Sequence, residues 1–186
     1  SDKVKKTYKM FNDFGYNEDN TIFILCSDHG YPDSSKESGK PEYYTKNNLT
    51  HDLILTDDNI MIPFFIKYPG CKKGLTVDKT ICSIDLYQTI IDIIGLEKND
   101  NLIGKSLKPL MEGDNSSYNI EFHRTDSRLA LQTGRGTSIR NHNYKYCCYQ
   151  DNIRGGGLEE FFDIIDDPLE KKNLIDDNKY EDIINT

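Results

Sequence analysis

The chain has 186 residues, of which 36% are hydrophobic and 29% charged, and its formal net charge is −8. This length allows one substantial core, and the acidic excess argues against a general nucleic-acid binder, because phosphate contacts need clustered lysines and arginines. No run approaches the roughly 20 apolar residues of a membrane span. Five cysteines without Cys-x-x-Cys spacing indicate neither a disulfide framework nor a zinc knuckle, which favours a reducing compartment such as the cytoplasm.

The chain begins with a predicted helix followed by a predicted strand. Residues 2–15 predict the helix, because their apolar residues recur three or four positions apart and Gly15 can end it. Residues 21–26 predict the strand. Ile22–Cys26 are apolar without alternation, which is typical of a strand covered on both faces in a parallel sheet, so we expect Cys26 to be buried.

Further elements follow a long polar segment, residues 30–50, which reads as a loop. A short helix is expected within residues 53–62, a second strand at Pro63–Gly70, and a loop at 96–112. Ser83–Gly95 predicts the clearest helix, with Ser83 as N-cap. Its inward stripe is expected to consist of Ile84, Tyr87, Ile91 and Ile94.

From about residue 118 the pattern changes to short strands separated by turns, which predicts a small antiparallel sheet. A helix near Tyr180–Ile184 is expected to pack on one face, and Arg140 and Lys145 are expected to pair with acidic neighbours. Cys147 and Cys148 should face opposite sides of a strand. The four predicted strands are residues 129–133, 137–140, 144–149 and 161–164.

Two potential metal ligands, Asp28 and His29, come directly after the first predicted strand and precede Gly30. Open α/β sheets bind ligands at the carboxyl ends of their strands. A carboxylate oxygen suits hard ions such as calcium, whereas an imidazole nitrogen suits transition metals. A polar turn without a ligand is the alternative interpretation of Asp28 and His29 taken alone.

Segments along nearly the whole chain, in this order, resemble the sulfatase family of the alkaline phosphatase superfamily. The resemblance implies an α/β fold: part of a mixed sheet with flanking helices in residues 1–117, and a small four-stranded antiparallel sheet with a helix in 118–186. The segments that carry it are Asn20–Gly30, Ile62–Gly70, Ser83–Gly95, Gly104–Leu110, Ser138–Tyr146 and Glu160–Leu174.

The resemblance also implies a metal site and a reaction. Asp28 and His29 would ligate a divalent ion, calcium as in most sulfatases or zinc or manganese as in phosphate-acting relatives. The reaction would be hydrolysis of a sulfate ester, with a carbohydrate-linked substrate. The chain lacks the Cys-x-Pro-x-Arg pattern of the sulfatase nucleophile. We therefore expect it to be the C-terminal part of a larger enzyme, inactive without the N-terminal part that supplies the nucleophile.

One position departs from the family pattern. Where many sulfatases place a lysine that contacts the sulfate, this sequence has Asp52, preceded by His51. A carboxylate there would repel a dianion, so His51 is the favoured acid at the leaving-group oxygen. Three alternatives remain. His51 could be solvated and without a role, Lys46 could contact the anion instead, or Asp52 could meet a cation.

Two other functions stay open on the sequence. The histidine ligand and the missing lysine also suit a phosphotransferase or phosphodiesterase of the same superfamily, of the phosphoglycerol or phosphoethanolamine type. A non-catalytic binding module that keeps the fold without the chemistry is the third. The nucleophile position of the full-length gene separates the first two, and metal affinity tests the third.

Overall fold

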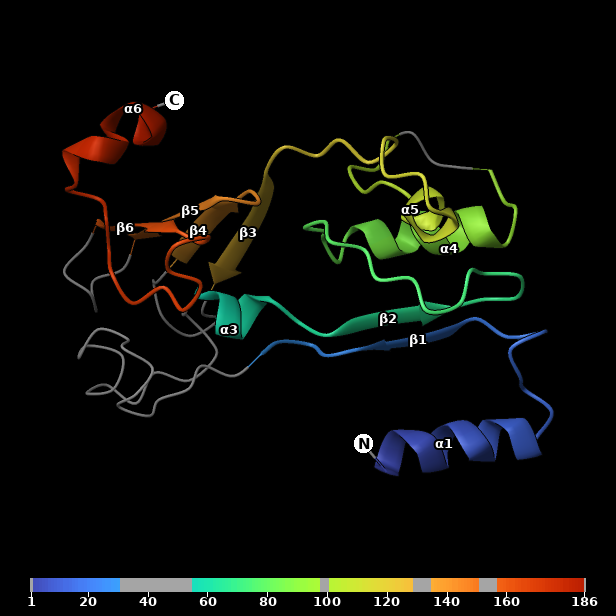
Figure 1. Ribbon diagram of the computed structural model, residues 1–186. Coiled ribbons are helices and arrows are strands. Elements are labelled where there is room, and N and C mark those ends of the chain that lie inside the picture. Colours follow the sequence, from blue (N-terminus) through green and yellow to red (C-terminus); the bar gives the residue numbers. More distant parts are fainter. Residues whose placement is uncertain (1, 31–54, 98–100, 129–134, 151–156, 186) are drawn as a thin grey trace. The chain divides into compact units, whose positions relative to one another are not determined.

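A computed structural model describes residues 2–30, 55–97, 101–128, 135–150 and 157–185 (Figure 1). Contacts divide the chain into two compact units. The first contains Ser1–Cys26 and Pro63–Asn119, and the second contains Ser27–Ile62 and Ile120–Thr186. The described residues 27–30 and 55–62 thus group with the C-terminal sheet.

The first unit is built on a two-stranded antiparallel ribbon. Strand β1 (Phe23–Cys26) pairs with β2 (Phe64–Lys67), so that Phe23 lies opposite Lys67. Helix α1 (Asp2–Asp13) lies along one side of the ribbon, where the Tyr8 and Phe23 rings are 4.9 Å apart (Figure 1). The helix, both strands and their order agree with the prediction.

The environment of β1 differs from the prediction. Among the described residues, β1 pairs only with antiparallel β2, not with a parallel neighbour. Leu25 and Cys26 are exposed, so the expectation of a buried Cys26 is wrong. Helix α1 contacts β1 through Tyr8 and Phe11, whose rings lie against Phe23.

Helix α4 (Asp85–Ile93) forms where predicted, but its capping and its buried face were predicted wrongly. The N-cap position is Ile84 rather than Ser83. The predicted inward stripe is largely exposed, with Ile84, Tyr87 and Ile94 each more than half accessible. The buried residues are instead Asp85, Gln88 and Thr89.

Hydrogen bonds to the following loop explain why the polar face of α4 is buried. The Asp85 carboxylate accepts the Lys105 N–H at 2.9 Å, and Thr89 Oγ1 accepts the Leu107 N–H at 2.9 Å. The loop was predicted to lack helix, yet it contains α5 (Lys108–Glu112). Pro109 fits there because the first helical turn needs no backbone N–H.

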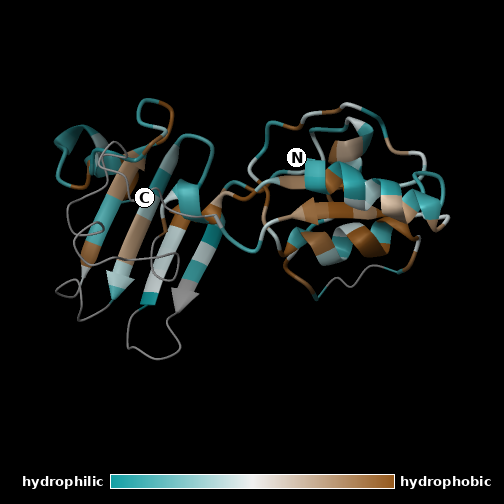
Figure 2. Cartoon of the chain, turned by 90° about the horizontal axis from the view of Figure 1, so that it is seen from below, coloured by the Kyte–Doolittle hydropathy of each residue, from teal (hydrophilic) through white to brown (hydrophobic). Residues whose placement is uncertain are grey.

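The second unit contains the predicted four-stranded antiparallel sheet, and its strand order is β3-β4-β5-β6. The first predicted strand, residues 129–133, lies outside the described residues, and β3 precedes it in the chain. Figure 2 shows hydrophilic and hydrophobic residues mixed along the strands of this sheet. The strands are β3 (His123–Arg128), β4 (Arg135–Arg140), β5 (Tyr144–Gln150) and β6 (Leu158–Asp163).

Each face of this sheet carries its own apolar cluster. Leu55, Cys147 and Tyr149 form one, beside helix α3 (Asp57–Ile60). Phe161, Leu174 and Tyr180 form the other, with the short helices η2 (Asn178–Tyr180) and α6 (Glu181–Ile184). Cys147 is buried and Cys148 is less so, which agrees with the predicted alternation. The sheet therefore holds α3 against one face and the C-terminal helices against the other.

Candidate functional site

Asp28 and His29 follow β1 after one residue, Ser27, at the start of the second unit. Asp28 Oδ2 lies 3.6 Å from His29 Nε2, and the two side chains are 85% and 39% exposed. The backbone N–H of His29 donates to the Asp28 carboxylate at 3.0 Å and, with the nearby imidazole, lowers the pKa of Asp28. The pair therefore presents an ionised carboxylate beside an imidazole.

The His29 ring is oriented by the backbone. Its Nδ1 lies 2.6 Å from the carbonyl oxygen of Gly30. A carbonyl can only accept, so Nδ1 carries the hydrogen, and Nε2 of the neutral ring holds the lone pair that a metal ligand needs. The Ser27 hydroxyl donates to the His29 carbonyl at 2.6 Å and holds the same turn.

Gly30 connects this turn to α3. Its N–H donates to the Asn59 carbonyl at 2.6 Å. A Cβ at position 30 would lie 2.1 Å from the Asp58 carbonyl oxygen, closer than any side chain can approach a backbone oxygen. Only glycine allows α3 to lie against the turn that carries Asp28 and His29.

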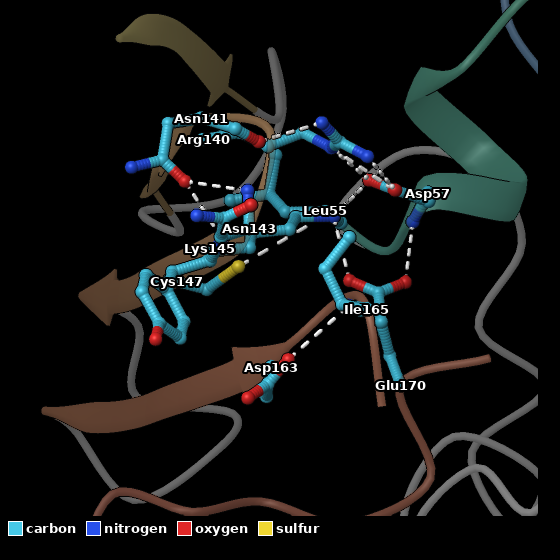
Figure 3. Close-up of polar contacts among 11 residues, drawn as sticks. Leu55, Asp57, Arg140, Asn141, Asn143, Lys145, Cys147, Asp163, Ile165 and Glu170 are labelled. Carbon is cyan, nitrogen blue, oxygen red and sulfur yellow. Dashed lines mark hydrogen bonds and ion pairs between the residues drawn. The ribbon is translucent and has the colours of Figure 1, made fainter. Parts of the chain in front are cut away.

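A charged cluster holds the N-terminal end of α3 against the sheet (Figure 3). Asp57 lies 2.8 Å from Lys145 Nζ and 3.0 Å from the Arg140 guanidinium. Lys145 also pairs with Glu170 at 2.7 Å, and Glu170 accepts the Asp57 N–H at 2.5 Å. The predicted pairing of Arg140 and Lys145 with acidic residues is confirmed.

Burial and charge act in opposite directions within this cluster. Burial alone would raise the pKa of Asp57, but Lys145 and Arg140 outweigh it and lower that pKa. Burial raises the pKa of Glu170, which Lys145 only partly offsets. The Lys145 side chain is fully buried, and its two carboxylate partners raise its pKa despite that burial. Lys145 therefore stays charged.

Asp28 and His29 fit part of a divalent-metal site. Their oxygen and nitrogen donors match both calcium and transition-metal chemistry. In the part of the chain that the structure describes, no group of three or more His, Cys, Asp or Glu side chains could hold a metal. Two ligands fill only part of a six- to eight-coordinate shell.

The structure does not describe the other site residues expected from the sequence. His51, with Asp52 and Lys46, lies outside the described residues. His142 lies in the turn between β4 and β5. The sequence predicted an acidic partner for Lys145 but did not identify Asp57 or Glu170 as that partner. The available signal was the Asp57-Asp58 pair at a helix start, because buried lysines require carboxylates.

A model of the C-terminal region of N-sulphoglucosamine sulphohydrolase matches residues 49–186. The chain belongs to the sulfatase family. Its sulfatase fold is part of the alkaline-phosphatase-like α/β architecture expected from the sequence. None of its described helices has the length and apolar character to cross a membrane.

Relatives of this sulfatase-family chain are much longer than the chain itself. The Δ4,5-hexuronate-2-O-sulfatase of Bacteroides thetaiotaomicron is 29% identical over 89% of the chain, and 32% of that protein is covered. An arylsulfatase of Clostridium perfringens is 29% identical over 89%, covering 31% of its length. The solved structure of a 2-O GAG sulfatase matches 97% of this chain, with a TM-score of 0.76 and 25% identity, and the match covers 38% of the sulfatase's own chain. The chain thus spans about a third of these proteins.

Proposed function

We propose that the protein containing this chain hydrolyses sulfate esters of carbohydrates. The observation that carries the proposal is the turn after β1. There His29 Nδ1 donates to the Gly30 carbonyl, so the lone pair of a metal ligand is left on Nε2, 3.6 Å from the Asp28 carboxylate. Sulfatase relatives support the reaction, and the relative named for hexuronate 2-O-sulfate supports the substrate class. Residues 1–117 would contribute to the catalytic domain, and 118–186 would form its C-terminal subdomain.

Asp28 and His29 would hold a divalent ion, which we infer to be calcium, with zinc or manganese as the alternatives. Such an ion polarises ester oxygens and offsets their negative charge. The exposed Asp28 carboxylate supplies charge, and His29 supplies a fixed nitrogen. The nucleophile and the remaining ligands would come from the part of the protein outside this chain.

His51 is proposed as the acid that protonates the leaving-group oxygen. An imidazole can donate a proton near neutral pH. Its neighbour Asp52 stands where many sulfatases carry an anion-binding lysine, so His51 would be the cationic group at this place. Replacing His51 with alanine should lower turnover and leave bound metal unchanged.

The test compares the full-length protein with its Asp28→Asn variant on 4-nitrophenyl sulfate and 4-nitrophenyl phosphate. We expect sulfate turnover with stoichiometric metal in the wild type, and loss of both in the variant, measured by absorbance and by elemental analysis. Turnover of the phosphate ester alone would favour the phosphotransferase or phosphodiesterase alternative. Metal binding without turnover of either ester would favour the binding module.

A further inference from the structure

The charged cluster and the proposed metal ligands are joined by an unbroken series of contacts within the second unit. We propose that Lys145, Asp57 and Glu170 are positioning residues that set the orientation of Asp28 and His29 through α3 and Gly30. This inference rests on the proposed metal site. It goes further, because it assigns to the C-terminal sheet a role in metal binding that involves no contact with the ion.

The first step is the fixation of α3 by the sheet. Thr56, the N-cap residue of α3, makes no side-chain capping bond, and Glu170 accepts the first amide of the helix instead. The other Glu170 oxygen pairs with Lys145 on β5, which also binds Asp57. One lysine therefore fixes both the first side chain of α3 and the carboxylate that caps its first amide (Figure 3).

The backbone of Glu170 supports this interpretation. Glu170 has a φ of +52°, and it is the one non-glycine residue with positive φ among those described. Such a conformation is disfavoured for a residue with a Cβ and persists where the surroundings over-determine it. The Glu170 carboxylate is held by the Asp57 N–H and by Lys145 at once, and the strained backbone places the carboxylate between them.

The second step runs from α3 to the imidazole. The Asn59 carbonyl of α3 accepts the Gly30 N–H, while the Gly30 carbonyl accepts from His29 Nδ1. Gly30 is thus bound to α3 through its N–H and to the His29 ring through its carbonyl oxygen. A shift of α3 relative to the sheet moves Gly30 and changes where His29 Nε2 points.

Packing alone does not account for the cluster. The apolar contact of Leu55 with Cys147 and Tyr149 already places the segment before α3 on the sheet. Apolar residues of similar volume often replace a buried ion pair without loss of stability. Charged groups that converge in a fixed geometry are better suited to setting a precise position than to adding stability.

Two variants of one residue in the full-length protein test the inference. Glu170→Ala removes the acceptor of the Asp57 N–H, whereas Glu170→Gln keeps an oxygen there. We expect Glu170→Ala to weaken Ca²⁺ binding, measured by calorimetry and repeated with Mn²⁺, by about tenfold or more. Glu170→Gln should weaken it by about threefold, because it keeps the acceptor but loses the charge that pairs with Lys145. Hydrogen exchange of the peptide containing Gly30 should quicken in Glu170→Ala only.

Matched controls separate positioning from general destabilisation. Phe161→Leu loosens the cluster on the opposite face of the sheet, and Tyr180→Phe removes a hydroxyl bond to Asp163 there. Both should lower the unfolding midpoint without changing Ca²⁺ affinity. If Glu170→Ala fails to fold, Asp57→Asn, which keeps the side-chain shape, replaces it and should weaken Ca²⁺ binding by about threefold or more.

The outcomes distinguish this inference from the proposed function. Wild-type Ca²⁺ affinity and wild-type exchange at Gly30 in Glu170→Ala overturn the positioning role, and so does an equal loss in Phe161→Leu at matched stability. If Asp28→Asn weakens metal binding in the same series, the metal site still stands. If Asp28→Asn binds as tightly as wild type, the metal site and the positioning role both fail.

Discussion

Two aspartates, one in each unit, begin a helix, and the protein satisfies them by different means. Asp57 opens α3 and is held by two cations, Lys145 and Arg140. Asp85 opens α4 and is fully buried, and neutral groups surround it: the N–H groups of Cys82 and Lys105 at 3.0 and 2.9 Å, and the Tyr118 hydroxyl at 2.5 Å.

A glycine completes both arrangements. A Cβ at Gly30 would lie 2.1 Å from the carbonyl oxygen of Asp58 in α3, and a Cβ at Gly104 would lie 2.2 Å from that of Ile84, just before α4. In each unit a loop is therefore brought into backbone contact with the start of a helix. The two units therefore share this backbone contact, but the aspartate that opens the helix has ionic partners in one unit and neutral hydrogen-bond donors in the other.

The largest effect is expected where the partners are ionic. Lys145→Met should lower the free energy of unfolding by about 3–5 kcal/mol, because it leaves the Asp57 and Glu170 carboxylates buried without their shared cation. Urea denaturation followed by circular dichroism measures the change. A loss no greater than that of Tyr118→Phe would remove the distinction between ionic and neutral partners.

Gly104→Ala should come next, with a loss of about 3 kcal/mol, because the new methyl group meets backbone rather than a flexible side chain. The same denaturation experiment applies. Metal affinity should be unchanged, because Gly104 belongs to the unit without Asp28 and His29. A fall in Ca²⁺ affinity in this variant would show that the two units are coupled.

Tyr118→Phe tests the neutral arrangement. It removes one of three donors to the Asp85 carboxylate and should cost about 1.5 kcal/mol. Burial and the nearby Asp85 raise the pKa of Tyr118, so the phenol remains protonated and keeps donating through the alkaline range. The variant should therefore lose the same stability at pH 7 and pH 9, and a difference that vanishes at pH 9 would contradict this.

The smallest effect is expected from an exposed ion pair. Glu18 pairs with Lys67, and with Lys73 at 2.9 Å, and these lysines lower its pKa from 4.5 to about 2. Because the folded pKa is depressed, the stabilisation is present above pH 4.5 and is lost as the pH falls towards 2. Glu18→Gln should thus differ from wild type in melting temperature at pH 6 but not near pH 2, and added salt should shrink the difference at pH 6.

Local patterns predicted most elements of this fold, because apolar spacing and turn residues act over short stretches. They predicted the β4–β5 turn, the final helix and the antiparallel sheet. They failed for α4, whose apolar stripe is exposed while its polar face binds the loop near Lys105 and Leu107. The face of a helix that is buried depends on contacts with residues distant in sequence, and the apolar spacing within the helix does not identify those residues.

The candidate site was predictable to a similar extent. Asp28 and His29 were identified from their place after a strand, and whether they ligate metal stays a prediction. The contact of Gly30 with α3 and the role of Glu170 were not predictable. The first contact joins residues that are 29 positions apart in the sequence, and the second joins residues that are 113 positions apart. No short-range pattern encodes such pairs.

The close approach at Gly30 has a consequence for variation at this codon. Every single-base missense change adds at least a Cβ where the Asp58 carbonyl oxygen already lies. In a saturation library the position should therefore tolerate no replacement, even in a background stabilised elsewhere. Directed evolution of this protein would have to vary other positions and leave the glycine untouched.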